Sequence, residues 1–193
     1  MKRRTLLGFL ALGSIVPPGP FFAHVHAQPK TLKGIKEMQD NWKSLLAPGT
    51  PTPSPTEELK LSKDEWRKRL QPASYGVLRE EDTERAGSSP LDREKRPGVF
   101  VCAGCGLPLF TSEMKFDSGT GWPSFFTMIP DSLKTKTDYK IIYPRTEYHC
   151  ARCGGHQGHV FEDGPAPTGL RYCNNGLAID FVASGEKLPD LRS

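Results

Sequence analysis

The stretch Tyr148-His-Cys-Ala-Arg-Cys-Gly-Gly-His-Gln-Gly-His-Val-Phe161, followed by Gly169-Leu-Arg-Tyr-Cys-Asn-Asn175, concentrates most of the chemistry of this chain. It holds three of the five cysteines. The first two of these are spaced C-x-x-C, and Cys102-Ala-Gly-Cys105 repeats the spacing upstream. The two pairs account for four cysteines and leave Cys173 alone. The sequence therefore predicts one four-cysteine site and one separate thiol.

The four paired cysteines have the spacing of a metal site. Two C-x-x-C turns can place four thiolates around one zinc ion, and glycines after each turn let backbone amides face the sulfurs. Because four thiolates leave no position for water, we expect a structural zinc, one per chain. The expected ligands are Cys102, Cys105, Cys150 and Cys153. Two alternatives are a pair of disulfides, which suits an exported protein, and a redox C-x-x-C pair, although its usual βαβ setting is absent.

The unpaired cysteine has polar and basic neighbours. Side chains alternate along a strand, so Arg171, Cys173 and Asn175 are expected on one face. A guanidinium beside a thiol favours the reactive thiolate. His156 and His159, on a glycine-rich segment, can supply protons or hydrogen bonds to the same place. We interpret Cys173 as a nucleophile, whereas the alternative is a small buried hydrophobic residue.

A glycine-rich turn leads into an aromatic residue at Phe116-Asp-Ser-Gly-Thr-Gly-Trp-Pro-Ser-Phe-Phe126. Pro123 restricts the backbone after Trp122, which can then form the wall of an apolar pocket. The alternative is that Trp122 fills the core. His156 and His159 are unlike the H-E-x-x-H ligands of zinc hydrolases, so we do not expect them to bind metal.

The charge of the chain is concentrated at its start. Of the formal charge of +4, Lys2, Arg3 and Arg4 supply three, and residues 1–27 contain no acids. Removing this segment leaves 26 − 3 = 23 bases against 22 acids, or +1. A nearly neutral protein lacks the basic surface that binds nucleic acid or anionic membranes, so neither partner is expected.

Residues 1–27 have the pattern of a secretory signal peptide, with a basic start, an apolar run and a cleavage site before Gln28. Arg3-Arg4 also resembles a twin-arginine signal, although Leu6 replaces the usual aromatic residue. We therefore expect an exported protein, located in the periplasm. The alternative is an uncleaved N-terminal anchor.

The remainder divides into a linker and one domain. Residues 28–60 are rich in proline and are expected to form an extended tether, with a short helix over 35–46 that nothing obliges to pack. Residues 61–193 are expected to form a mainly β domain of two packed antiparallel sheets with short N-terminal helices. Ser62-Lys-Asp-Glu65 is a capping box for a helix to Leu70, and a second helix is expected over Ser74–Glu81. The expected strands are Val99–Cys102, Leu109–Phe110, Tyr139–Tyr143, Glu147–Cys150, His159–Phe161, Leu170–Cys173 and Ala178–Val182.

Four motifs together resemble those of the peptide-methionine (R)-S-oxide reductases, the B-type methionine sulfoxide reductase family. They are Cys102–Cys105, Phe116–Phe125, Cys150–Pro165 and Gly169–Asn175, and the likeness extends over about Leu61 to Val182. The resemblance implies a β-rich fold of two antiparallel sheets, a structural zinc and reduction of the R epimer of methionine sulfoxide. Such an enzyme repairs proteins after oxidative stress.

The resemblance also implies roles for individual residues. Cys173 would attack the sulfoxide sulfur, the oxygen would take up protons, and the cysteine would be left as a sulfenic acid. Trp122 would pack against the substrate methyl group, Phe161 would line the pocket, and Arg171 would support the thiolate. His156, His159 and Asn175 would hold the sulfoxide oxygen and its water.

The sequence departs from the family pattern at three positions. Gln157 and Asn174 stand where an aliphatic residue is common. Thr120 lies in the Gly-x-Gly turn where many relatives carry a resolving cysteine. Recycling is therefore expected to need an external reductant, either thioredoxin-like or a small thiol. The expected substrates are oxidised proteins or peptides, and a monomer is expected.

Two other functions remain possible from the residues. A zinc-ribbon binding module would use its cysteines as a scaffold only. It requires a basic face or an aromatic stacking platform, and the nearly neutral charge that remains after residues 1–27 are removed is evidence against it. A thiol–disulfide exchange enzyme would need a second free cysteine, and none remains once the metal is bound.

The first prediction concerns export. The mature chain should begin near Gln28 and be recovered outside the cytoplasm, which N-terminal sequencing of the fractionated protein measures. If the twin-arginine route is used, replacing Arg3 and Arg4 by Lys should retain the protein inside the cell. Export that survives this change would instead indicate the general secretory route.

Overall fold

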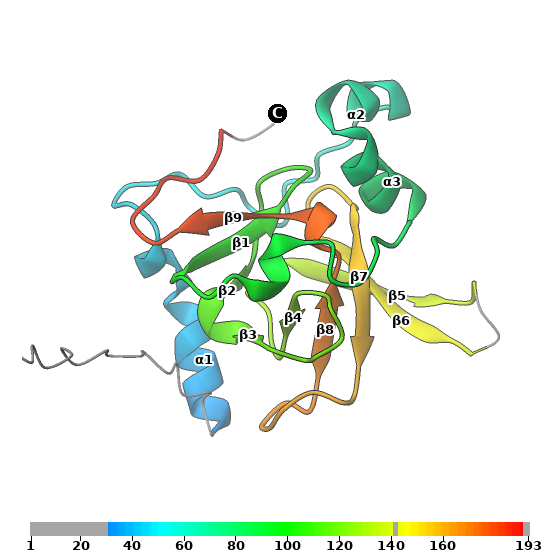
Figure 1. The fold of residues 1–193 in the computed structure, drawn as a ribbon. Coiled ribbons are helices and arrows are strands. Elements are labelled where there is room, and N and C mark those ends of the chain that lie inside the picture. The colour runs from blue at the N-terminus through cyan, green and yellow to red at the C-terminus, as the bar shows by residue number, and fades with distance from the viewer. Residues whose placement is uncertain (1–30, 141–142, 191–193) are drawn as a thin grey trace, which may run out of the picture.

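Two antiparallel sheets form the body of the protein in the computed structural model, which describes residues 31–140 and 143–190 (Figure 1). The smaller sheet has the order β2 (Pro108–Thr111), β1 (Gly98–Cys102), β9 (Ile179–Ala183). The larger has the order β3 (Lys115–Phe116), β4 (Ser124–Phe125), β8 (Arg171–Asn174), β7 (His156–Phe161), β6 (Arg145–Cys150), β5 (Leu133–Asp138). The predicted mainly β fold of two antiparallel sheets is confirmed. The expected signal peptide, residues 1–27, lies outside the described residues.

Aromatic rings join the two sheets. Phe110 of the smaller sheet stacks on Phe125 of the larger with ring centroids 4.0 Å apart, and Phe100 meets Phe125 edge-on at 5.1 Å. Tyr148 packs against Phe110 and against Tyr172, with centroids 6.3 and 5.4 Å apart. All five side chains are buried. Since burial of rings of this size is a large stabilising term, this cluster holds the two layers together.

The face of the larger sheet that points away from this core carries chemical groups. Side chains alternate along a strand, so Glu147 and Cys173 lie on the face opposite to their neighbours Tyr148 and Tyr172. The register places Lys136 opposite Glu147, Glu147 opposite His159, and His159 opposite Cys173. Residues directly opposite each other in antiparallel strands share a face. One row across four strands therefore contains the thiol, a histidine, a carboxylate and an ammonium group.

Short helices precede the sheets, as predicted. α2 (Lys63–Arg69) begins with the expected capping box, in which Ser62 Oγ accepts from the Glu65 amide while the Glu65 carboxylate accepts from the Ser62 amide. α3 (Pro72–Glu80) starts with proline, whose missing N–H is not needed there. Trp66 of α2 and Leu78 of α3 are buried. Turns of 3-10 helix complete the elements as η1 (Trp42–Leu45), η2 (Pro90–Arg93), η3 (Ser112–Met114) and η4 (Gly176–Ala178).

The expected tether over residues 28–60 requires correction for the part that the structure describes. α1 (Leu32–Asp40) buries Ile35, and Leu46 belongs to the hydrophobic core. The Gln39 amide donates to Thr127 Oγ1 at 2.9 Å and to the Met128 carbonyl at 3.0 Å. The segment therefore packs on the β domain, because its apolar residues find partners there that a local reading of the sequence does not contain.

The expected strand Tyr139–Tyr143 is also wrong in position. The strand is β5, which ends at Asp138, and Tyr139 and Tyr143 are exposed. Residues 141 and 142 lie outside the described part. Threonine and lysine alternate in β5, and only its two ends are buried. The hydrophobic periodicity of this edge strand is therefore too weak to locate it, and the pairing with β6 determines where it lies.

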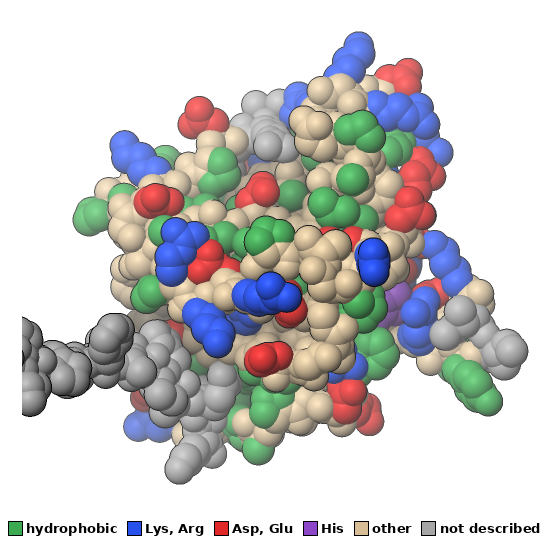
Figure 2. All heavy atoms as spheres, in the orientation of Figure 1, with side chains coloured by type: hydrophobic (Ala, Val, Ile, Leu, Met, Phe, Trp, Pro, Cys, Tyr) green, Lys and Arg blue, Asp and Glu red, His purple; other side chains and the backbone are tan. Residues whose placement is uncertain are grey.

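The surface carries mixed charge. On the face shown in Figure 2, lysine and arginine side chains are interspersed with aspartate and glutamate. Among the residues that the structure describes, no helix has both the length and the apolar composition to cross a membrane.

Candidate active site and metal centre

The four paired cysteines form one buried cluster. Their Sγ atoms all lie within 4.8 Å of one another, and both the Cys102–Cys153 and the Cys105–Cys150 sulfurs are 3.6 Å apart. A tetrahedral site with metal–sulfur distances of about 2.3 Å has sulfur–sulfur edges of about 3.8 Å. A disulfide would need about 2.05 Å, and all four thiols are free. The geometry fits the expected metal ion, and the alternative of two disulfides is not formed.

Glycines and tight turns shape this cluster. The Gly106 amide donates to the Cys102 carbonyl at 2.8 Å, and the Gly154 amide donates to the Cys150 carbonyl at 2.9 Å. Both glycines have positive φ, of 72° and 67°, which other residues adopt at a cost. Gln157 Nε2 donates to Cys102 Sγ at 3.4 Å. The glutamine that departs from the family pattern thus supplies a hydrogen bond to a metal-ligand sulfur.

A second site surrounds the unpaired thiol. Cys173 is half-buried at a cavity of about 150 Å³. Four predicted site residues, Trp122, His159, Phe161 and Asn175, line the cavity with it. Its other lining residues are Thr83, Arg145, Gly158 and Asn174. The cavity therefore combines aromatic walls with hydrogen-bonding groups beside one thiol.

Two predicted site residues lie outside the lining of this cavity. His156 is buried, and its ring centroid is 5.5 Å from that of His159. Arg171 is buried; its Nε and Nη2 each lie 2.8 Å from a carboxylate oxygen of Asp163, and its guanidinium lies over the Phe161 ring at 4.3 Å. His156 therefore adjoins the cavity only through His159, whereas Arg171 affects the Cys173 thiol directly.

Burial and nearby donors have opposite effects on the thiol. Burial raises the pKa of Cys173, and this is the largest effect. The positive charge of Arg171 lowers the same pKa, and hydrogen bonds from Thr120 and Arg171 lower it further. Arg171 therefore lowers the pKa of the thiol, as predicted, but burial raises this pKa by more. Thr120 itself joins a chain of hydroxyls, 2.8 Å from Ser118 Oγ, which is 2.8 Å from Ser124 Oγ.

Each of the two histidines is paired with a carboxylate. His159 Nε2 lies 2.8 Å from Asp138 Oδ2, and Arg145 Nη2 lies 2.6 Å from the same oxygen. The Lys140 amide donates to the other oxygen of Asp138, and these contacts hold the pKa of Asp138 far below its usual range. Burial lowers the pKa of His159, and the hydrogen bond to Asp138 opposes this effect. His156 Nδ1 lies 2.8 Å from Glu147 Oε1.

The two carboxylates of these pairs, with Arg145 and Lys136, were not identified from the sequence. Asp138 and Arg145 face each other across β5 and β6, as do Lys136 and Glu147. The sequence does contain a pattern that could have indicated them: the two charged positions in each strand are two residues apart and therefore share a face. Their meeting with the histidines depends on register, which their spacing does not reveal.

Glu84, also unpredicted, fixes two walls of the cavity. Its backbone carbonyl accepts from Trp122 Nε1 at 3.1 Å, and its amide donates to Asn175 Oδ1 at 3.1 Å. Its carboxylate accepts from the Gly176 and Leu177 amides at 2.6 and 3.0 Å. Burial raises the pKa of Glu84, and the two amides oppose the shift. Trp122 and Asn175 are therefore held in place by one buried residue.

Comparisons with known proteins agree on one family. A model of the SelR domain matches residues 70–183. The peptide methionine sulfoxide reductase MsrB of Methanosarcina barkeri is 51% identical over 126 residues, which cover 65% of this chain and 89% of that protein. MsrB of Pseudomonas putida strain GB-1 is 52% identical over 120 residues, covering 61% and 90%. The chloroplastic peptide methionine sulfoxide reductase B1 of Arabidopsis thaliana is 52% identical over 124 residues, covering 64% of this chain and 61% of that protein.

The second prediction concerns the metal. Replacing Cys102 or Cys150 by Ser should abolish binding of one metal ion per chain and lower the melting temperature strongly. For structural zinc the binding free energy, about 10 kcal/mol or more, is also folding free energy. Elemental analysis and thermal unfolding measure the two effects. Cys173→Ser is the matched control, because it removes a thiol outside the cluster and should keep the metal. A stable, metal-free wild-type protein would contradict the assignment.

Proposed function

The chain belongs to the SelR domain family of B-type peptide methionine sulfoxide reductases, and from this premise we propose that it reduces the R epimer of methionine sulfoxide in oxidised proteins and peptides. The proposal depends mainly on the thiol of Cys173, which borders a small cavity between Trp122 and His159. An aromatic wall suits the methyl group of the substrate, and polar groups suit its oxygen. The same walls offer a physical basis for choosing one epimer, because exchanging the methyl and the oxygen would place each against the wrong partner.

The reaction follows from a thiolate beside proton donors. The sulfur of Cys173 attacks the electrophilic sulfur of the sulfoxide, and the oxygen takes up a proton. In the overall step the oxygen moves from methionine sulfur to cysteine sulfur, which leaves a thioether and a sulfenic acid. The methionine sulfur gains two electrons and Cys173 loses two. His159, paired with Asp138, is the proton donor that borders the cavity.

The metal that we propose for the four-cysteine cluster is zinc, in a structural role. Four thiolates at tetrahedral spacing suit zinc and leave no position for water or substrate. The residues that would hold it are Cys102, Cys105, Cys150 and Cys153. The ion would fix the turns after β1 and β6.

The remaining parts of the proposal concern location and partners. Residues 1–27 would be removed on export, and the mature enzyme would act as a monomer in the periplasm. Because Thr120 replaces a resolving cysteine, the sulfenic acid would be reduced by an external thiol, either a small molecule or a thioredoxin-like protein.

The third prediction tests the activity itself. The purified protein should reduce the R epimer of a methionine sulfoxide peptide and leave the S epimer unchanged, as chromatography of the separated epimers measures. Cys173→Ser should abolish the reaction while metal content and melting temperature stay as in the wild type. Undiminished reduction by Cys173→Ser would reject the proposed nucleophile. Absence of reduction by the wild type would favour a binding module built on the metal site.

The fourth prediction concerns recycling. Without reductant, one equivalent of substrate should leave one sulfenic acid per chain and no internal disulfide, because the other four cysteines form the cluster that would hold the metal. A sulfenic-acid trap followed by mass spectrometry counts both products. The Thr120 hydroxyl contacts the Cys173 thiol, so Thr120→Cys should form an internal disulfide and increase turnover with a thioredoxin-type reductant. Thr120→Ser is the matched control.

A disulfide between Cys173 and one of the four clustered cysteines in the wild-type protein would contradict this scheme. It would also show that the cluster releases a ligand during turnover, which a structural metal site does not do.

A further inference from the structure

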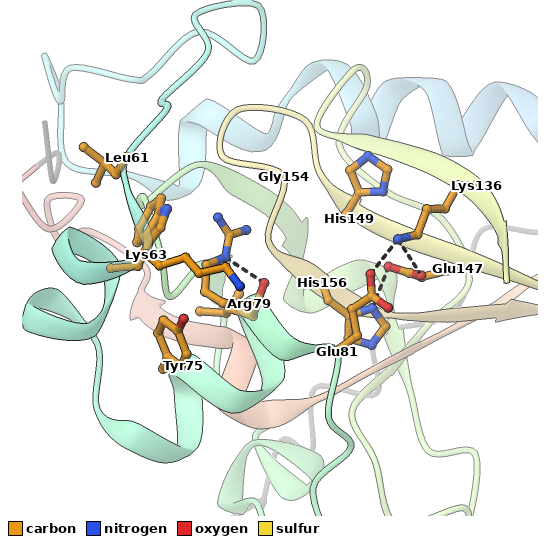
Figure 3. Close-up of a pocket in the computed structure, with 12 residues that line it drawn as sticks. Leu61, Lys63, Tyr75, Arg79, Glu81, Lys136, Glu147, His149, Gly154 and His156 are labelled. Carbon is orange, nitrogen blue, oxygen red and sulfur yellow. Dashed lines mark hydrogen bonds and ion pairs between the residues drawn. The ribbon is translucent and has the colours of Figure 1, made fainter. Parts of the chain in front are cut away.

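His156 and Glu147 form a buried pair beside a second cavity. Their side chains are 3% and 4% exposed, and Nδ1 of the imidazole lies 2.8 Å from Oε1 of the carboxylate. The second cavity, of about 420 Å³, is lined by both residues and by Trp66, Tyr75 and Lys136 (Figure 3). The pair therefore lies between this opening and His159, which lines the Cys173 cavity.

The outer oxygen of the carboxylate is held by a cation. Lys136 Nζ lies 3.2 Å from Glu147 Oε2 and 2.6 Å from Glu81 Oε1, and Figure 3 shows the ammonium between the two acids. Burial of a carboxylate is costly unless it has such a partner. Because Lys136 holds Oε2, the carboxylate of Glu147 stays in place while Oε1 accepts a hydrogen bond from Nδ1–H of His156.

The other ring nitrogen of His156 has no hydrogen-bond partner in the described part of the chain. Nε2 of His156 is buried and makes no hydrogen bond within the described residues. A buried polar atom without a partner is costly, so its persistence calls for a reason. His159 is held in the opposite way, through Nε2 by Asp138. The two histidines thus keep different ring nitrogens for further contacts.

We propose that Glu147 is a positioning residue for the reduction of the sulfoxide. It holds the His156 imidazole with a proton on Nδ1, so that His156 exchanges its other proton at Nε2 only. A carboxylate bonded to one nitrogen fixes both the orientation and the tautomer of the ring. The inference rests on the proposed function, because His156 serves the sulfoxide oxygen through His159, whose ring centroid is 5.5 Å from its own and which lines the Cys173 cavity.

The pairing of β6 with β7 accounts for the contact between Glu147 and His156. The register places Glu147 directly opposite His159, in the same row as Cys173 and two strands away from it. The irregularity between Tyr148 and His149 changes the pairing beyond this point, so that His156 pairs with His149. Such an irregularity re-aims side chains locally. It brings the His156 ring to the same carboxylate that a regular ladder would leave to His159.

The test combines a spectroscopic and a kinetic measurement on the metal-loaded full chain. In the wild type, ¹⁵N spectra of the imidazoles should show His156 protonated at Nδ1. Glu147→Ala should shift this ring towards the Nε2-protonated form and lower kcat about 100-fold, with KM nearly unchanged. Formate should restore part of kcat, because the lost side chain lines an open cavity that a small carboxylate can enter.

Two further variants make the result specific. Glu147→Gln keeps an oxygen that accepts from Nδ1–H, so it should retain the tautomer and more activity than Glu147→Ala. If the alanine variant fails to fold, the ring spectrum of the wild type still tests the proposal. Glu162→Ala is the matched control, because Glu162 is exposed one residue beyond β7. It should leave kcat unchanged, with or without formate.

The inference is overturned if the wild-type ring is protonated at Nε2 alone, or if Glu147→Ala keeps kcat within about twofold. It is equally overturned if formate leaves the loss unchanged, because the carboxylate would then act only by packing. The ring spectrum does not depend on turnover. An inactive wild-type protein with the Nδ1-protonated ring would thus reject the proposed function and retain the geometric role of Glu147.

Discussion

Four thiols meeting at one point form the constraint on which the rest of this structure depends. Cys102 ends β1 of the smaller sheet and Cys105 lies in the turn after it. Likewise, Cys150 ends β6 of the larger sheet and Cys153 lies in the turn after it. A metal ion at this point would connect the two sheets at their ends, and its binding energy would then stabilise the fold. The turn after β6 leads directly into β7, so the same point anchors the strand that carries both histidines.

The strands of the larger sheet serve the core and the site at the same time. Tyr148 and Tyr172 pack on the smaller sheet, while the adjacent Glu147 and Cys173 face the opposite side. Close packing of the aromatic cluster therefore fixes the separation between the thiol and the groups around it. Protein interiors resist small displacements, and this rigidity keeps the histidines and the thiol in one arrangement.

The buried charges of the site are satisfied by specific neighbours. Asp138 receives hydrogen bonds from the Lys140 amide, Arg145 and His159, and Glu84 receives them from two backbone amides. Without such partners, the desolvation of each carboxylate would oppose folding. The hydrogen bonds also orient the groups before substrate arrives, which is the condition for electrostatic stabilisation of a developing charge.

The amino-acid sequence by itself determined the features that depend on local spacing. The C-x-x-C pairs indicated the four-cysteine cluster, the capping box located α2, and counting left Cys173 as the separate thiol. The motifs around Trp122 and His159 indicated the family and five residues that meet at one cavity. These features depend on residues that are close together in the sequence, or on combinations of residue types that few other folds contain.

Only the tertiary structure decided which distant groups meet. Strand register brings Asp138 to His159 and Glu147 to His156, and a shift by one residue would turn both carboxylates to the other face. The packing of α1, the position of β5 and the support of Trp122 by Glu84 likewise depend on partners far away in the chain. Sequence spacing does not encode such contacts, because they result from how the whole chain buries its apolar surface and pairs its strands.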